Sequence, residues 1–136
     1  MKTLTPYLFF PGTCEEAMNY YKECLDGEIT AIQRFGDTEM PVEEGYRDKI
    51  MHGELKAEGI HMMFSDGAPH KEITEGDNVQ LSITVETIEE QDTLFEALAK
   101  DGKVTMPLEK TFWGARYGML KDKFGIRWML NCELDN

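Results

Sequence analysis

Thr13-Cys14-Glu15-Glu16 and Thr87-Ile88-Glu89-Glu90 begin two segments whose apolar residues have helical spacing, and the chain repeats itself around them. At an offset of 74 (13 to 87) the first segment falls on the second. At an offset of 66 (59 to 125), Gly59-Ile60-His61-Met62-Met63-Phe64 falls on Gly125-Ile126-Arg127-Trp128-Met129-Leu130. We therefore predict an α+β protein made of two copies of one small unit, related by a pseudo-twofold axis, with a functional cleft between them.

Each copy is expected to have the element order βαβββ, because runs of β-favouring residues alternate with turn signals around each helix. In the first copy we expect a strand at residues 3–10, a helix from Thr13 to about Leu25, a strand at Ile29–Phe35, and a hairpin of Lys49–Lys56 and Ile60–Ser65. In the second we expect a strand at Val79–Val85, a helix that ends at Asp101-Gly102, a strand near Lys103–Met106, and a hairpin of Arg116–Lys121 and Ile126–Asn131.

Capping signals define where both helices begin. Thr13 with Glu16, and Thr87 with Glu90, have the spacing of capping boxes. Residues 36–48 are rich in acidic residues, glycine and proline, and we interpret them as a mobile loop. The domain prediction is a single domain over 1–136, with module 1 at about 1–66, a polar linker at about 67–77 and module 2 at about 78–132.

Composition limits the function. The chain has 26 acidic and 14 basic residues, and its net charge of −12 repels nucleic acids and anionic membranes. No apolar run approaches the length of a membrane span, and none has the form of a signal peptide. Three cysteines without metal-type spacing indicate a reducing compartment. We expect a cytoplasmic protein that binds neither nucleic acid nor membrane.

Several stretches resemble a known family. Phe112-Trp113-Gly114-Ala115-Arg116-Tyr117-Gly118 and Gly125-Ile126-Arg127-Trp128 are similar to the PhnB-like branch of the vicinal oxygen chelate superfamily, which includes glyoxalase I, bleomycin-resistance proteins and extradiol dioxygenases. Tyr7-Leu8-Phe9-Phe10-Pro11-Gly12 and Lys49-Ile50-Met51-His52-Gly53-Glu54-Leu55 also match that branch. The resemblance implies tandem βαβββ modules that form a curved mixed sheet, a cup with the helices outside, and commonly a homodimer.

The resemblance also implies where a metal would bind. The superfamily's four ligand positions fall on Pro6, Met63, Gln80 and Met129, and these residues do not suit Zn²⁺, Mg²⁺ or Mn²⁺. We therefore expect no metal and no other cofactor. The fallback set is His52, Glu54 and His61: the first two share a strand face, and His61 lies on the adjacent strand.

Strand alternation identifies a ligand-binding set. Residues of the last strand of each module, and of the strand that begins the second, point into the cup. Together with an aromatic and guanidinium cluster before the last hairpin, the candidates are Gln80, Ser82, His61, Met63, Trp113, Arg116, Arg127, Met129 and Asn131. Trp113 and Arg116, with Phe112 and Tyr117, either stack on a planar ligand, or close one end of the sheet, or pack at a dimer contact.

Two residues have open alternatives. Arg127 either pairs with Glu54 or binds an anionic ligand, and His61 is a second potential partner for Glu54. Cys14, in the first turn of a helix, is the candidate nucleophile, but the adjacent Glu15 and Glu16 oppose a low thiol pKa, and a nucleophilic role is disfavoured.

The predicted function is that of a PhnB-like protein that binds an unidentified small molecule in its cup. The alternatives are a metal-dependent lyase or isomerase of glyoxalase type, and a drug-sequestering binding protein of the bleomycin-resistance kind. Members of this branch often carry the name of a 3-demethylubiquinone methyltransferase. The chain has no glycine-rich strand–loop–helix turn for a nucleotide-like cofactor, which disfavours a literal reading of that name.

Overall fold

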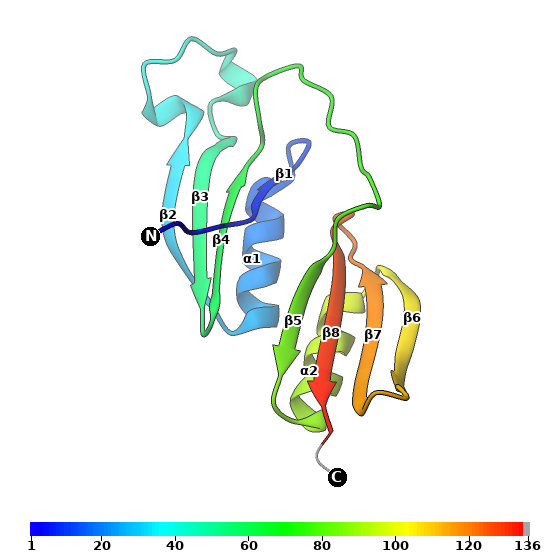
Figure 1. The fold of residues 1–136 in the computed structure, drawn as a ribbon. Helices are drawn as coiled ribbons and strands as arrows, with labels where there is room; N and C mark the ends of the chain where they lie inside the picture. Colours follow the sequence, from blue (N-terminus) through cyan, green and yellow to red (C-terminus); the bar gives the residue numbers. More distant parts are fainter. Residues whose placement is uncertain (135–136) are drawn as a thin grey trace. The chain divides into compact units, whose positions relative to one another are not determined.

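The computed structural model of the protein describes residues 1–134. Along this chain the elements follow one another as a βαβββ unit that occurs twice (Figure 1). The chain divides into two compact units, Met1–Thr74 and Glu75–Asn136, and the division lies inside the predicted linker at 67–77. The tandem βαβββ architecture is thus confirmed. Each unit forms its own four-stranded sheet.

The first unit contains β1 (Tyr7–Phe9), α1 (Cys14–Leu25), β2 (Glu28–Arg34), β3 (Ile50–Ala57) and β4 (Ile60–Ser65). The strand order is β1-β4-β3-β2. β1 pairs with β4 in parallel, and the other pairs are antiparallel. The second unit contains β5 (Leu81–Val85), α2 (Ile88–Ala99), β6 (Lys103–Lys110), β7 (Ala115–Lys121) and β8 (Arg127–Glu133). Its strand order, β5-β8-β7-β6, is that of the first unit, and β5 again pairs with β8 in parallel.

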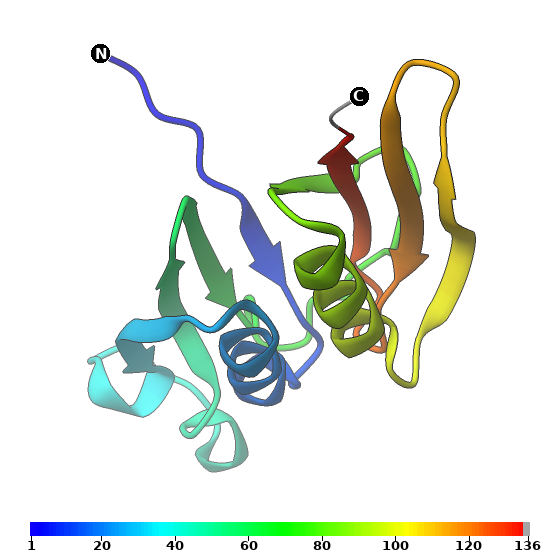
Figure 2. The ribbon, with the colours of Figure 1, turned by 90° about the horizontal axis from the view of Figure 1, so that it is seen from below.

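In each unit the helix covers one face of its own sheet, as the view from below makes visible (Figure 2). The core of the first unit is aromatic: the rings of Tyr21 and Phe64 stack with their centroids 6.0 Å apart, and Phe10 lies 6.3 Å from Phe64. The second unit is centred on Trp128, Leu130 and Leu98, all 1% exposed or less. Each such side chain contributes roughly 1.5–3 kcal/mol by leaving water, so the helix-covered face is what holds each sheet to its helix.

Within residues 1–74, no helix packs on the opposite face of the first sheet, and we call this face the helix-free face. On β4, Met62 and Phe64 are buried beneath α1, so the alternating residues His61 and Met63 lie on the helix-free face. On β3, Gly53 and Leu55 are buried, and His52 and Glu54 therefore lie on the helix-free face as well. This face positions the candidate site.

The two helix starts differ from the predicted pair of capping boxes. The Thr13 side chain makes no cap hydrogen bond, so that prediction is wrong. The Asp66 carboxylate, at the end of β4, takes its place and accepts from the backbone N–H of Cys14 at 2.9 Å and of Ile50 at 2.8 Å. Thr87 does cap α2, since its hydroxyl accepts from the N–H of Glu90 at 3.1 Å. The Glu90 carboxylate accepts from Glu86 rather than from the N-cap.

The two glycines that follow the helices are explained by close packing rather than by an unusual backbone. A Cβ on Gly102 would overlap the carbonyl oxygen of Lys121, and a Cβ on Gly27 would lie 3.0 Å from the carbonyl oxygen of Lys56. The left-handed position falls one residue earlier in each copy, on Asp26 (φ 52°) and Asp101 (φ 60°). Both helices thus end beside the hairpin of their own unit.

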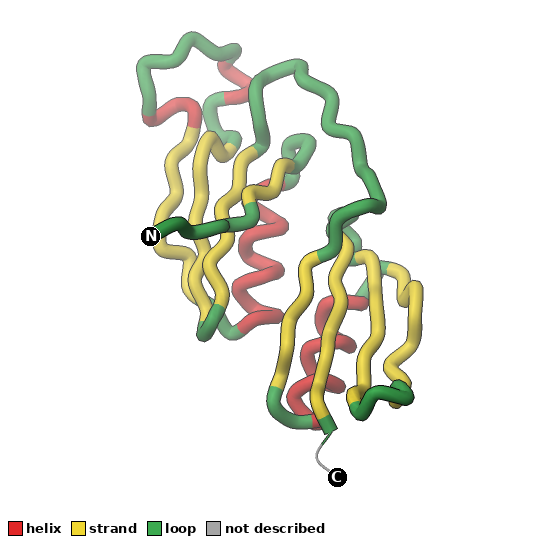
Figure 3. The backbone as a smooth tube through the Cα atoms, viewed as in Figure 1, coloured by secondary structure: helices red, strands yellow, loops and turns green. Residues whose placement is uncertain are grey.

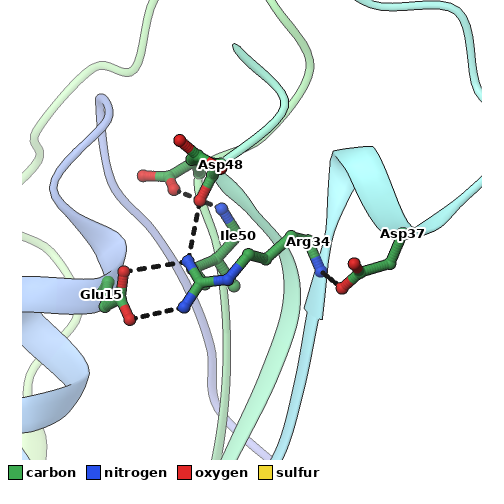
Figure 4. A network of polar contacts seen from close by, with 6 residues as sticks. Glu15, Arg34, Asp37, Asp48 and Ile50 are labelled. Carbon is green, nitrogen blue, oxygen red and sulfur yellow. Dashed lines mark hydrogen bonds and ion pairs between the residues drawn. The ribbon is translucent and has the colours of Figure 1, made fainter. Parts of the chain in front are cut away.

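Residues 36–48, predicted to be a mobile loop, contain two 3₁₀ turns, Phe35–Asp37 and Glu44–Tyr46. The Tyr46 hydroxyl donates to the carbonyl of Gly67 at 2.8 Å, and its ring lies 5.0 Å from that of Phe35. Arg34, at the end of β2, holds the start of this segment to α1 (Figure 4). Its guanidinium makes a bidentate pair with Glu15, at 2.9 and 2.7 Å, and donates to the carbonyl of Asp48 at 2.8 Å.

Candidate functional site

A chain of four side chains crosses the helix-free face of the first sheet. The Tyr7 hydroxyl lies 2.8 Å from Nδ1 of His52, and Nε2 of His52 lies 3.0 Å from one carboxylate oxygen of Glu54. The other oxygen of Glu54 lies 2.8 Å from Nε2 of His61. The strands position the four residues directly, because β1, β4 and β3 are neighbours in the sheet order. We call this set the Tyr–His–Glu–His chain.

The protonation states in this chain follow from its hydrogen bonds. The two imidazoles hold the pKa of Glu54 below its usual range, so the group is a carboxylate at neutral pH and accepts from both rings. Nε2 of each histidine therefore carries the proton. Nδ1 of His52 is then an acceptor, and the Tyr7 hydroxyl donates to it. Burial raises the pKa of Tyr7, which keeps that hydroxyl protonated.

Two aromatic rings lie at the β1 end of this chain. Tyr7 and Phe9 stack with centroids 5.0 Å apart, and the side chains remain 37% and 49% exposed. Phe9 also lines a cavity of about 260 Å³, whose other walls come from the segment after β4: Gly67, Ala68, Lys71, Glu72, Ile73 and Thr74. This segment is part of the long connection between the modules, drawn as loop in Figure 3. An apolar cavity, an exposed aromatic pair and a polar chain thus adjoin one another within one module.

Of the predicted binding residues, His61 and Met63 belong to this face. Gln80 is exposed and lies just before β5. In the second module, Trp128 and Leu130 are buried, so the alternating residues Arg127, Met129 and Asn131 lie on the face of that sheet away from α2. Ser82 is the register partner of Met129 and is exposed. Nε of Arg127 donates to the carbonyl of Gly76 at 3.4 Å.

The structure separates Arg116 from the aromatic cluster with which it was grouped. Its guanidinium donates to Gln91 at 3.2 Å and to Asp92 at 2.8 Å, both on α2. Trp113 keeps its aromatic neighbours, with Phe112 at 4.9 Å and Tyr117 at 5.6 Å. Phe112 and Trp113, between β6 and β7, are 97% and 58% exposed and therefore accessible. Arg116, on β7, is instead hydrogen-bonded to α2.

The fallback metal residues His52, Glu54 and His61 do come together, but as a hydrogen-bonded chain. Within residues 1–134 no three His, Cys, Asp or Glu side chains are arranged to hold a metal ion. Glu54, one of the two alternatives considered as a partner for Arg127, pairs with the imidazoles of His52 and His61 in its own module, and His61 is the other partner that the sequence suggested for it.

Cys14 is fully buried. Burial, and then the charges of Asp66 and Glu15, raise the pKa of its thiol. A thiol that stays protonated is a poor nucleophile, which agrees with the expectation from the sequence that Cys14 is not a nucleophile.

Sequence reasoning missed Tyr7 and Phe9 as site residues. They belong to the run Tyr7-Leu8-Phe9-Phe10, in which every residue is large and apolar or aromatic, so alternation of polarity could not assign a face. The usable signal was Phe10: it lies one residue past Phe9, is fully buried, and fixes the opposite direction for its neighbour. Reading that signal requires knowing which residue of the run is buried.

Comparison with known proteins identifies the relatives of this chain. Residues 2–131 match the model of the family described as 3-demethylubiquinone-9 3-methyltransferase. Protein YjdN of Escherichia coli (strain K12) is 30% identical over 138 aligned positions, which cover 94% of this chain and 93% of that protein.

Two solved structures are similar over nearly the whole chain. Protein PA1353 from Pseudomonas aeruginosa is 40% identical with a TM-score of 0.90, covering 99% of this chain and 100% of its own. The PhnB protein from Bacillus cereus is 34% identical with a TM-score of 0.81, covering 96% and 99%. More distant structures of the glyoxalase, bleomycin-resistance and dioxygenase group share the fold. The resemblance to the PhnB-like branch is therefore confirmed. None of the helices in residues 1–134 has the length and apolarity needed to cross a membrane.

Proposed function

Because the chain belongs to the 3-demethylubiquinone-9 3-methyltransferase family and is PhnB-like, we propose that it binds a small planar molecule on the helix-free face of its first sheet. The bound molecule would stack against Tyr7 and Phe9, extend an apolar part into the cavity beside Phe9, and turn a polar group toward the Tyr–His–Glu–His chain. The residues predicted in the second module, Gln80, Ser82, Trp113, Arg116, Arg127, Met129 and Asn131, are proposed separately as ligand contacts of that module.

The exposed stacked pair of Tyr7 and Phe9 carries the proposal. Large aromatic side chains lose the benefit of burial when they face water. This stacked pair, of which Phe9 lines the cavity, offers a flat apolar surface for a ring. Small-molecule sites combine mostly apolar walls with a few fixed polar groups. Here the Phe9 cavity supplies the first, and His52, Glu54 and His61 supply the second.

The experiment is titration of ¹⁵N-labelled protein with 4-methylanisole, a planar probe without a hydrogen-bond donor. We expect the largest amide shifts at Phe9, Gly67 and Ala68. Phe9→Ala should weaken binding at least fivefold. The matched control is Val104→Ala, which removes an exposed apolar side chain (44% exposed) from β6 of the other module. Shifts that avoid Phe9 and its cavity, with an affinity unchanged in Phe9→Ala, would refute the proposal.

The alternative function is that of a metal-dependent lyase or isomerase. A metal ion on His52, Glu54 and His61 would have to replace the hydrogen bonds between Glu54 and the two imidazoles, which are 3.0 and 2.8 Å long. Addition of Zn²⁺ tests it directly. The proposal predicts no stoichiometric zinc after dialysis, measured by elemental analysis. One equivalent of retained zinc that is lost in His52→Ala would favour the metal-dependent enzyme.

We also propose that the protein is a cytoplasmic homodimer, as the resemblance implies. The second module exposes Phe112, Trp113 and Ile88 around one concavity, an apolar surface suited to a protein contact. Light scattering at micromolar concentration is the test. A monomer mass across the whole range would contradict the dimer.

A further inference from the structure

We propose that Nδ1 of His61 is the hydrogen-bond acceptor for a hydroxyl group on the bound ring, so that the site selects small phenols over their ethers. This inference rests on the proposed function, because it assigns the polar half of the same site. It concerns one atom of the Tyr–His–Glu–His chain and the class of ligand which that atom recognises.

The first step is the orientation of His61. Its Nε2 lies 2.8 Å from a carboxylate oxygen of Glu54, which can only accept. The proton of a neutral imidazole is therefore on Nε2, and Nδ1 has a lone pair. The His61 side chain is 40% exposed, and its Nδ1 has no partner among residues 1–134. A fixed, accessible acceptor is the result.

The second step is that both ring nitrogens of His52 are already hydrogen-bonded. Nδ1 of His52 receives the Tyr7 hydroxyl, and Nε2 of the same ring donates to Glu54. Each oxygen of Glu54 accepts from one imidazole. Of the two rings, His61 alone offers a nitrogen lone pair to a ligand, because its neighbours in the chain use theirs on one another.

The third step is spacing. β1 and β4 are adjacent and parallel, with Tyr7 in register with Met63. His61 lies on the same face of β4, two residues before Met63. With strands about 4.8 Å apart and about 3.3 Å per residue, the two positions are about 8 Å apart along the diagonal. One benzene ring that rests against Tyr7 and carries a hydroxyl covers this separation, so a monocyclic phenol is the matching class.

Charge favours the neutral hydroxyl over an ionised one. Glu54 is a carboxylate, and the whole protein has a net charge of −12, so a phenolate would enter a negative environment. Lys56, the register partner of His61, is the cation nearest in the sheet, and its side chain is exposed to solvent, where water screens it. A simple phenol, with a pKa near that of tyrosine at about 10, stays neutral at pH 7.5 and can donate to His61.

The experiment compares the binding of 4-methylphenol with that of 4-methylanisole. The second compound is the methyl ether of the first and has no hydroxyl hydrogen to donate. We expect the wild type to prefer the phenol by roughly 3–10-fold, the effect of one net hydrogen bond. In His61→Phe an aromatic ring is kept and the acceptor is lost, so the preference for the phenol over 4-methylanisole should vanish. His70→Asn, which removes a surface imidazole that contacts Glu43, is the control and should keep the preference.

A second measurement does not depend on any variant. The ¹⁵N shifts of the neutral His61 ring in the wild type should show the proton on Nε2 and a lone pair on Nδ1, and addition of the phenol should shift the Nδ1 signal. The opposite tautomer would overturn the inference, as would an equal affinity for the two probes. If 4-methylanisole itself fails to bind near Phe9, the proposed function fails; if it binds there without a preference for the phenol, only the present inference fails.

Discussion

In the first module a carboxylate holds the start of the helix to the sheet, whereas in the second module an amide does so. Asp66 accepts from the N–H groups of Cys14 on α1 and Ile50 on β3. Gln91, on α2, donates from its side-chain nitrogen to the carbonyls of Arg116 on β7 and Leu130 on β8, at 2.8 and 3.1 Å. Ile50 and Arg116 are equivalent by the offset of 66 (50 to 116).

The difference shows that the fold requires a buried polar link at this place but not a particular one. One module leaves backbone donors to be satisfied and supplies an acceptor from the end of β4. The other leaves carbonyls and supplies a donor from the helix itself. Buried backbone groups without hydrogen-bond partners are costly in either case. The two modules therefore satisfy different backbone groups with different side chains, although their strand order is the same.

The largest expected effect is at Asp66. Asp66→Ala leaves two buried N–H groups without an acceptor, each costing about 1–3 kcal/mol, and we expect the free energy of unfolding to fall by about 3–5 kcal/mol. Gln91→Ala removes a donor from two carbonyls, which tolerate partial satisfaction better, and should cost about 1–3 kcal/mol. Urea unfolding of both variants measures the comparison. A larger loss for Gln91→Ala would reverse the assignment of the stronger link.

The glycines after the helices give the next effect. Gly102→Ala places a methyl group into the backbone of Lys121 and Asp122, and we expect a loss of about 2–3 kcal/mol. Gly27→Ala meets its nearest atom at 3.0 Å, so a smaller shift relieves it and about 1 kcal/mol is expected. Thermal unfolding of the two variants in parallel checks the order. Equal losses would mean that both hairpins approach their helices equally closely.

Removal of the N-cap hydroxyl should lower the free energy of unfolding by about 1 kcal/mol more in the second module than in the first. Thr87→Ala loses the hydrogen bond to the N–H of Glu90, and N-cap losses typically cost about 0.5–2 kcal/mol. Thr13→Ala loses no cap bond and should cost less than about 0.3 kcal/mol. Chemical denaturation with both variants decides it, and a substantial loss in Thr13→Ala would show that the hydroxyl does cap α1 in solution.

The smallest effect concerns the ion pair of the first module. Arg34 holds the pKa of Glu15 below its usual range, so this pair stabilises the fold above the unfolded pKa of about 4.3 and is lost as the pH falls through the lower folded value. The pair is largely exposed, and Glu15→Gln should cost about 0.5–1 kcal/mol at pH 7. The difference from the wild type should shrink toward pH 3. Glu16→Gln, at the adjacent exposed position, is the control; the same loss there would deny Arg34 a specific role.

The order of helices and strands could be predicted from the sequence because each module gave an independent indication of the same βαβββ unit. Ile60–Ser65 was located to the residue, and the helix and strand order followed from two independent copies. The cap at Thr13 could not be rejected from the sequence, since its true replacement, Asp66, lies 52 residues from Cys14. Local spacing carries no information about a partner that only the parallel pairing of β1 with β4 brings near.

The candidate site was predictable only in part for the same reason. His52, Glu54 and His61 lie on one hairpin, so alternation alone was enough to group them. Tyr7 joins them from 45 residues away, and its role depends on the position of β1 beside β4. Arg116 was grouped with its aromatic sequence neighbours, whereas its partner Asp92 lies 24 residues earlier on a helix.

The parallel pairing of β1 with β4 also has a consequence for synthesis on the ribosome. The first strand to emerge stays without a partner until residue 65 has been added, and then every strand of the first sheet has its neighbours within Met1–Thr74. Domains generally fold as units during translation, N-terminal first. The aromatic run Tyr7-Leu8-Phe9-Phe10 is therefore synthesised well before β4, the strand with which β1 pairs.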